Sequence, residues 1–156
     1  MKANKLLYKN LSTFLALGFG TGLSKKAPGT FGTLMAIPVF LISELLPGNI
    51  NYLFVITLFF IGIYVSDRTS KLLKIKDPSC IVIDEIVAFV LLLMLINPTL
   101  LNYILAFVLF RVFDIWKPFP INILEIKFKG GLGIMIDDIA AALFSFVIIT
   151  IINYAY

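Results

Sequence analysis

Long apolar stretches alternate with short polar segments along this chain. No charged side chain occurs between Lys26 and Glu44 (17 residues), between Glu44 and Asp67 (22), between Glu85 and Arg111 (25), or after Asp138 (18). A helix that crosses a lipid bilayer needs roughly 17–25 apolar residues, so each stretch has the length of a membrane span. The third stretch contains Asn97-Pro98, which predicts a turn between two shorter helices.

This pattern predicts an all-α protein: a compact polytopic membrane bundle of five to six helices, forming one domain over residues 1–156. Helices are expected near 4–18, 33–46, 51–75, 82–96, 99–113 and 134–153. Glycines and prolines predict connections at 20–32, 47–49, 77–79, 97–99 and 117–133. The lysines of the first predicted helix leave open whether it crosses the bilayer or lies in its interface.

Composition supports the membrane interpretation over its alternative, a buried soluble bundle. Hydrophobic residues make up 60% of the chain and charged residues 14%, against roughly 45–50% and about 25% in soluble proteins. A soluble fold with so few charges could not cover its own surface. The net charge of +4, without a nucleic-acid motif, indicates contact with lipid and no nucleic-acid partner. The oligomeric state is left open.

The charged residues predict an orientation in the membrane. Lysine and arginine fall before residue 27, in 67–81 and in 111–133, whereas the turns at 47–50 and 97–99 have none. Basic loops face the cytoplasm in membrane proteins. Every acidic residue except Glu44 lies in or beside these basic segments, so the acidic residues are expected together at the cytoplasmic helix ends.

Two doubled acids, Asp84-Glu85 and Asp137-Asp138, begin predicted helices among isoleucines and valines. Acids at a helix N-terminus are favoured by the helix dipole, and capping with salt bridges is the simpler interpretation. However, desolvating a carboxylate costs several kcal/mol without a nearby cation. Facing carboxylate pairs without histidine suit Mg²⁺ or Mn²⁺. Asp114 ends a third helix.

Glycine-rich segments precede two of the predicted helices, at residues 20–33 and 129–133. Neither has the spacing of a P-loop. Their backbone N–H groups could still hold an anion, with Lys25, Lys26 and Lys129 beside it; close helix packing is the alternative. Arg111 could bind phosphate or pair with Asp114, which follows it by three residues.

Missing residue types exclude several reaction mechanisms. The chain has no histidine, so neither a phosphohistidine nor a catalytic triad can form. The single cysteine, Cys80, lacks an arginine six residues later, and no Asp-x-Asp occurs, which argues against cysteine-based and aspartyl-phosphate phosphatases. Metal-assisted attack by water is the phosphatase chemistry that remains.

Five ordered segments together resemble the bacterial phosphatidylglycerophosphatase A family. They are GFGTGLS at 18–24, APGT at 27–30, IDE at 83–85, FRVFDIWKPFPI at 110–121 and KGGLGIMIDD at 129–138. The resemblance implies removal of the terminal phosphate of phosphatidylglycerophosphate, with Mg²⁺ as cofactor (two ions, or Mn²⁺ instead, are alternatives). Together with the apolar stretches and the basic loops, the resemblance to a bacterial family predicts a multi-pass protein of the inner membrane whose active site faces the cytoplasm.

Combining the resemblance with the residue chemistry assigns roles. The predicted metal ligands are Asp84, Glu85, Asp137 and Asp138, and the catalytic set adds Asp114, as a further ligand or as the group that orients water. The predicted substrate-binding residues are Lys25, Lys26, Thr30, Arg111, Lys117, Lys129, Gly130 and Gly131. The alternative function is a small ion-coupled transporter or membrane subunit, which would place acids near the bilayer midplane and on several helix faces.

Overall fold

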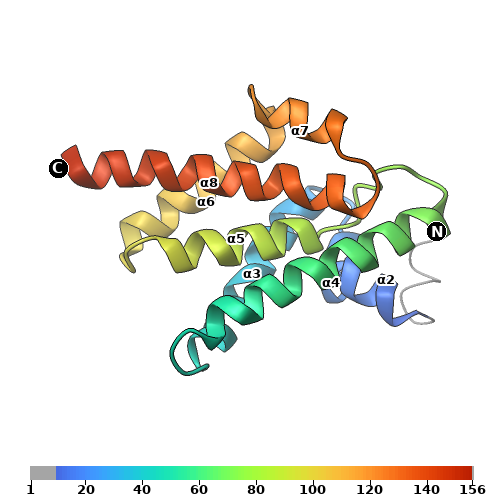
Figure 1. Ribbon diagram of the computed structural model, residues 1–156, viewed down its shortest axis with the longest axis horizontal. Coiled ribbons are helices and arrows are strands. Elements are labelled where there is room, and N and C mark those ends of the chain that lie inside the picture. The colour runs from blue at the N-terminus through green and yellow to red at the C-terminus, as the bar shows by residue number, and fades with distance from the viewer. Residues whose placement is uncertain (1–9, 156) are drawn as a thin grey trace.

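The protein is an all-α bundle in its computed structural model, which describes residues 10–155 except the side chains at 125 and 126. The elements (Figure 1) are α2 (Leu11–Ala16), the 3₁₀ segment η1 (Gly18–Leu23), α3 (Pro28–Glu44), α4 (Ile50–Leu73), α5 (Ile83–Leu95), α6 (Leu100–Trp116), α7 (Ile121–Lys127) and α8 (Gly131–Ala155). The described part contains no strand, so the predicted fold class is confirmed. The start of the first predicted helix, residues 4–9, lies outside the described residues.

Helix α5 forms the centre of the bundle. It packs against α3, α4, α6 and α8 (Figure 1). Its buried side chains point in all directions, and Ile86, Val87, Phe89, Val90 and Leu92 are each at most 1% exposed. A helix that is apolar on every face must be surrounded by other elements. Asp84 and Glu85 begin this same helix, so its position carries them into the protein.

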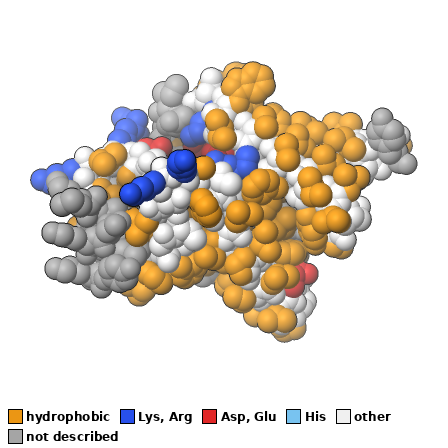
Figure 2. Space-filling view, turned by 180° about the vertical axis from the view of Figure 1, so that it is seen from behind, with side chains coloured by type: hydrophobic (Ala, Val, Ile, Leu, Met, Phe, Trp, Pro, Cys, Tyr) orange, Lys and Arg blue, Asp and Glu red, His pale blue; other side chains and the backbone are white. Residues whose placement is uncertain are grey.

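Two helices, α4 with 24 residues and α8 with 25, are long and apolar enough to cross a membrane. Helices α3 and α6 have 17 residues each, at the lower limit of the roughly 17–25 residues of a span, and α5 has 13 and is shorter. Large apolar side chains such as Leu41, Phe60 and Ile151 are about 60% exposed. In Figure 2, hydrophobic side chains cover one end of the molecule and basic side chains gather at the other. These features suggest a membrane protein.

The start of α3 differs from the prediction, which placed Gly29 and Gly32 in a loop. The helix begins at Pro28, a favoured residue for the first helical turn. The two glycines lie inside it because the neighbouring chain comes very close: a Cβ at Gly32 would lie 2.7 Å from Cβ of Val82. The glycines at 29 and 32 therefore reflect close packing of α3 and do not mark a loop.

The prediction of an unbroken connection over 117–133 was wrong, because α7 lies within it. Prolines at 118 and 120 and glycines at 130 and 131 bound the segment, and they suggested a loop. Between them, Ile121 is fully buried and α7 packs on α8. Burial of this side chain stabilises a two-turn helix that has little tendency to form alone.

Candidate active site

A polar cavity of about 250 Å³ lies where the starts of α3, α5 and α8 meet the end of α6. Its lining includes all five acids predicted to be catalytic, Asp84, Glu85, Asp114, Asp137 and Asp138, as well as Gly29, Asp77, Ser79, Arg111 and Lys117. Residues from four helices and one connection therefore converge at one end of the bundle. The transporter alternative predicted acids near the bilayer midplane and on several helix faces, and it does not account for acids gathered at one end of the bundle.

Three of the acids form a compact group suited to a cation. One carboxylate oxygen from each of Asp84, Glu85 and Asp138 lies within 4.8 Å of the other two. Asp84 is 9% exposed and Asp138 is 3% exposed. Three buried oxygens, Oδ1 of Asp84, Oε2 of Glu85 and Oδ2 of Asp138, accept no hydrogen bond from the described residues. Because buried polar atoms almost always have partners, these oxygens have the features of ligands for a cation.

The charge of the cavity leads to the same inference. Among the described residues, six carboxylates and two cationic side chains, Arg111 and Lys117, line the cavity. Asp77 is exposed, whereas the other five carboxylates are buried or partly buried. So many negative charges repel one another strongly, which opposes the entry of a doubly charged phosphate unless a cation is bound. Carboxylate oxygens without nitrogen or sulfur ligands suit Mg²⁺ or Mn²⁺. The residues present therefore fit a divalent cation.

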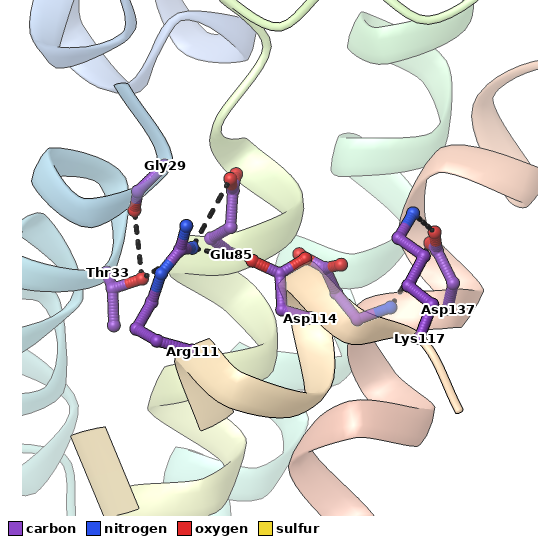
Figure 3. Close-up of polar contacts among 8 residues, drawn as sticks. Gly29, Thr33, Glu85, Arg111, Asp114, Lys117 and Asp137 are labelled. Carbon is purple, nitrogen blue, oxygen red and sulfur yellow. Dashed lines mark hydrogen bonds and ion pairs between the residues drawn. The ribbon is translucent and has the colours of Figure 1, made fainter. Parts of the chain in front are cut away.

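Arg111 of α6 connects three helices within the site (Figure 3). Its Nη1 lies 2.6 Å from Oδ2 of Asp114 and 3.8 Å from Oε1 of Glu85. The same nitrogen donates a 3.4 Å hydrogen bond to Oγ1 of Thr33, which in turn donates to the carbonyl of Gly29 at 2.9 Å. The buried Nε of Arg111 has no acceptor among the described residues. The predicted pairing of Arg111 with Asp114 is therefore present in the structure.

Gly29 leaves no space for a side chain at this position. A Cβ there would lie 2.3 Å from Oε1 of Glu85 and 2.9 Å from both terminal nitrogens of Arg111. The first turn of α3 therefore brings its backbone against the charged groups, and only glycine permits this approach.

Asp137 has a partner of its own. Nζ of Lys117 lies 2.5 Å from its Oδ2, and its Oδ1 accepts a 3.1 Å hydrogen bond from the backbone N–H of Asp138. Asp137 is not one of the three acids in the compact group. The side chain of Asp137 therefore contacts Lys117, whereas that of Asp138 lies in the compact acidic group. The sequence had suggested the same role for both residues.

The remaining predicted substrate-binding residues, Lys25, Lys26 and Thr30 among them, do not line the polar cavity. Lys129 and Gly130 line a smaller cavity of about 140 Å³, which shares Asp77 and Asp137 with the first.

Gly131 packs against α4, where a Cβ would lie 1.9 Å from the carbonyl oxygen of Ile63. This contact favours the packing interpretation of the second glycine segment over the phosphate one.

Three site features were not predicted from the sequence: the cavity-lining Asp77 and Ser79, and the Thr33 contact with Arg111. The polar turn at 77–79, just before the doubled acid at 84, could have indicated Asp77 and Ser79 as site residues. Thr33 follows Gly29 by one helical turn, but nothing in the nearby sequence indicates its contact with Arg111. Cys80 does not line the cavity, and burial raises the pKa of its thiol, which fits the exclusion of cysteine chemistry.

Comparison with known proteins identifies similar chains. A family model described as phosphatidylglycerophosphatase A matches residues 14–153. The phosphatidylglycerophosphatase A of Escherichia coli (strain K12) is 39% identical over 143 residues, which are 91% of this chain and 83% of the relative. That of Haemophilus influenzae is 40% identical over 153 residues, 96% and 93% of the two chains. A Bacteroides thetaiotaomicron protein with the provisional name phosphatidylinositol-3-phosphatase is 35% identical over 152 residues, 92% and 94%. No solved structure matches.

Proposed function

The chain belongs to the phosphatidylglycerophosphatase A family, and we propose that it removes the terminal phosphate of phosphatidylglycerophosphate with the help of a divalent cation. The products are phosphatidylglycerol and inorganic phosphate. The family supports the phosphatase activity and the lipid substrate. The requirement for Mg²⁺ and the roles of individual residues are inferred from the site.

One observation carries the metal-dependent part of this proposal. Asp84, Glu85 and Asp138 each have a buried carboxylate oxygen without a hydrogen-bond partner in the described part of the chain, and the three residues bring carboxylate oxygens within 4.8 Å of one another. These three side chains would hold the cation. A bound Mg²⁺ would neutralise charge on the phosphate and make water more acidic.

The reaction is a displacement at phosphorus. The oxygen of water forms a bond to phosphorus, the bond from phosphorus to the glycerol oxygen breaks, and a proton from water ends on that glycerol oxygen. Phosphate monoesters react very slowly without a catalyst, so the site must both position water and stabilise negative charge.

The chain's own residues supply these two functions in our proposal. Arg111 and Lys117 contact phosphate oxygens, since they are the two cationic side chains that line the cavity. Asp114, 12% exposed, orients the attacking water and takes its proton while Arg111 holds the carboxylate in place. Asp137 keeps Lys117 directed into the cavity through their ion pair.

We further propose that the protein crosses the inner membrane several times, with the cavity on the cytoplasmic side. The two long apolar helices and the bacterial relatives support a membrane location. The basic segments before residue 27, at 67–81 and at 111–133 support the orientation. The polar cavity would then lie at the depth of lipid headgroups, where the substrate's phosphate is found.

Phosphate release by the purified chain in detergent micelles tests the function. We expect hydrolysis of phosphatidylglycerophosphate with Mg²⁺, loss of activity with EDTA, and recovery when Mg²⁺ is added back. Phosphatidylinositol 3-phosphate serves as the comparison substrate, because one relative's provisional name refers to it. Faster release from the inositol lipid would reassign the substrate, and undiminished activity in EDTA would remove the metal from the mechanism.

A further inference from the structure

A second cavity, of about 350 Å³, opens between α3 and α6 with α5 as its floor. Its lining is apolar, and its rim is partly exposed: Leu34, Ile37, Leu41 and Ile104 are each 42–59% exposed. At the base, Phe89 is 1% exposed and packs edge-to-face against Phe107, with ring centroids 6.1 Å apart. We call this cavity the α3–α6 groove.

The groove lies in line with the polar cavity along the axes of the same three helices. On each helix, a polar residue of the site is followed at four-residue intervals by two groove residues: Thr33, Ile37 and Leu41 on α3, Glu85, Phe89 and Leu93 on α5, and Arg111, Phe107 and Tyr103 on α6. Residues four apart lie on one face of a helix. Eight residues of helix rise about 12 Å, so the groove extends roughly this far from the charged groups.

We propose that the α3–α6 groove binds an acyl chain of the lipid whose phosphate enters the polar cavity. This proposal rests on the proposed function, and it adds a binding site for the apolar part of the substrate. The order of surfaces along the three helices, charged and then apolar, is the order of headgroup and acyl chain in a phospholipid. Binding the chain would place the phosphate among the acids of the polar cavity.

Alignment with the polar cavity favours a substrate acyl chain over other occupants of the groove. A second copy of the chain or an ordinary membrane lipid could cover an apolar face anywhere on the bundle. A substrate chain must instead start at the charged site, and the groove begins one helical turn from Thr33, Glu85 and Arg111.

Ile37→Trp tests the groove, and Ile42→Trp is its matched control. Both isoleucines lie on α3 and are about half exposed, at 42% and 56%, but only Ile37 lines the groove. Turnover is measured on phosphatidylglycerophosphate with long acyl chains and on the same headgroup phosphate without acyl chains. We expect Ile37→Trp to raise KM for the long-chain lipid roughly tenfold, the effect of losing about two buried methylene groups. Turnover of the deacylated compound should not change, and Ile42→Trp should leave both substrates unaffected.

A binding measurement tests the groove without depending on phosphatase activity, so that the two proposals can fail separately. Phosphatidylglycerophosphate with a diazirine in one acyl chain is photolysed with the detergent-purified protein, and the labelled residues are mapped by mass spectrometry. We expect label on the groove faces of α3 and α6. Excess unlabelled substrate should remove it but phosphatidylcholine should not, and Ile37→Trp should remove it whereas Ile42→Trp should not.

Label elsewhere on the bundle, equal competition by phosphatidylcholine, or an unchanged KM in Ile37→Trp would overturn the groove proposal. Inactivity of the unmodified protein on both compounds would instead overturn the proposed function, and the labelling pattern would still report on the groove.

Discussion

Nζ of Lys117, at the end of α6, lies 2.5 Å from Oδ2 of Asp137, in the first turns of α8. This contact separates Asp137 from its neighbour Asp138, whose carboxylate belongs to the compact acidic group. The sequence suggested that Asp137 and Asp138 are equivalent metal ligands. In the structure, Asp137 forms an ion pair with Lys117, whereas Asp138 belongs to the candidate cation site.

Removal of Lys117 should destabilise the protein. In Lys117→Met, the Asp137 carboxylate, 5% exposed, would lose its counter-charge. Loss of one member of a partly buried pair costs about 1–3 kcal/mol, which corresponds to a fall in Tm of roughly 3–10 °C. Adding Asp137→Asn to Lys117→Met should recover part of this loss in a thermal melt. A double variant no more stable than Lys117→Met would show that the ion pair is not the cause.

Asp137→Asn and Asp138→Asn should respond differently to Mg²⁺. Ligand binding to the folded state raises Tm, by the equivalent of about 2.7 kcal/mol at a hundredfold excess over Kd. We expect this rise to persist in Asp137→Asn and to vanish in Asp138→Asn, because only the latter removes a member of the compact group. If the Mg²⁺-induced rise in Tm were lost equally in both variants, Asp137 would also be a metal ligand.

Asp84→Asn should lower phosphatase turnover about 100-fold or more while the protein remains folded in the membrane. Asparagine keeps the shape of the side chain but lacks the charge that a hard cation requires. Glu44→Gln, at the end of α3 remote from the cavity, is the control and should keep most activity. Normal turnover in Asp84→Asn would exclude this carboxylate from the mechanism.

Gly29→Ala should reduce turnover strongly with little loss of helical structure. The added methyl group would lie within 2.9 Å of Glu85 and of Arg111, so at least one of these side chains must move. Gly62→Ala is a matched control on α4, where the added Cβ meets the flexible end of Met135 at 2.6 Å, and it should keep its activity. Turnover and circular dichroism on the same preparations compare the two, and an active Gly29→Ala protein would contradict the close packing described here.

Gly131→Ala should act through stability. Its added Cβ would lie 1.9 Å from the Ile63 carbonyl oxygen, so α8 and α4 would have to separate. We expect Tm and the active fraction to fall together, while the folded fraction keeps normal turnover. Reduced turnover at an unchanged Tm would instead support the phosphate-binding role that the glycine segment suggested.

The orientation can be tested by thiol labelling in intact cells, in a Cys80→Ser background that removes the chain's single cysteine. Cysteines introduced as Gly48→Cys and Pro98→Cys should react with a membrane-impermeant reagent, because both positions lie in turns without basic residues. Lys74→Cys and Lys127→Cys should not react until the cells are opened. Labelling of either lysine position from outside would place the cavity on the wrong side for a cytoplasmic substrate.

The all-α fold, most helix positions and the end of the bundle at which the acids gather could be predicted from the amino-acid sequence. These properties depend on local patterns: apolar stretches of helical length, turn residues between them, and charges confined to alternate connections. The predicted helix at 82–96, for example, is observed at Ile83–Leu95. Its doubled acid could be recognised because two carboxylates in an apolar helix stand out without knowledge of any neighbour.

Which of these groups contact one another depends on the packing of the helices and could not be predicted from local patterns. Arg111 and Thr33 are 78 residues apart, and their contact depends on how α6 and α3 are rotated about their axes. The ion pair between Lys117 and Asp137 and the packing of Gly131 on Ile63 likewise depend on the placement of whole helices. Periodicity defines the face of a single helix on which a residue lies, whereas the neighbour of that face is set by the packing of the complete bundle.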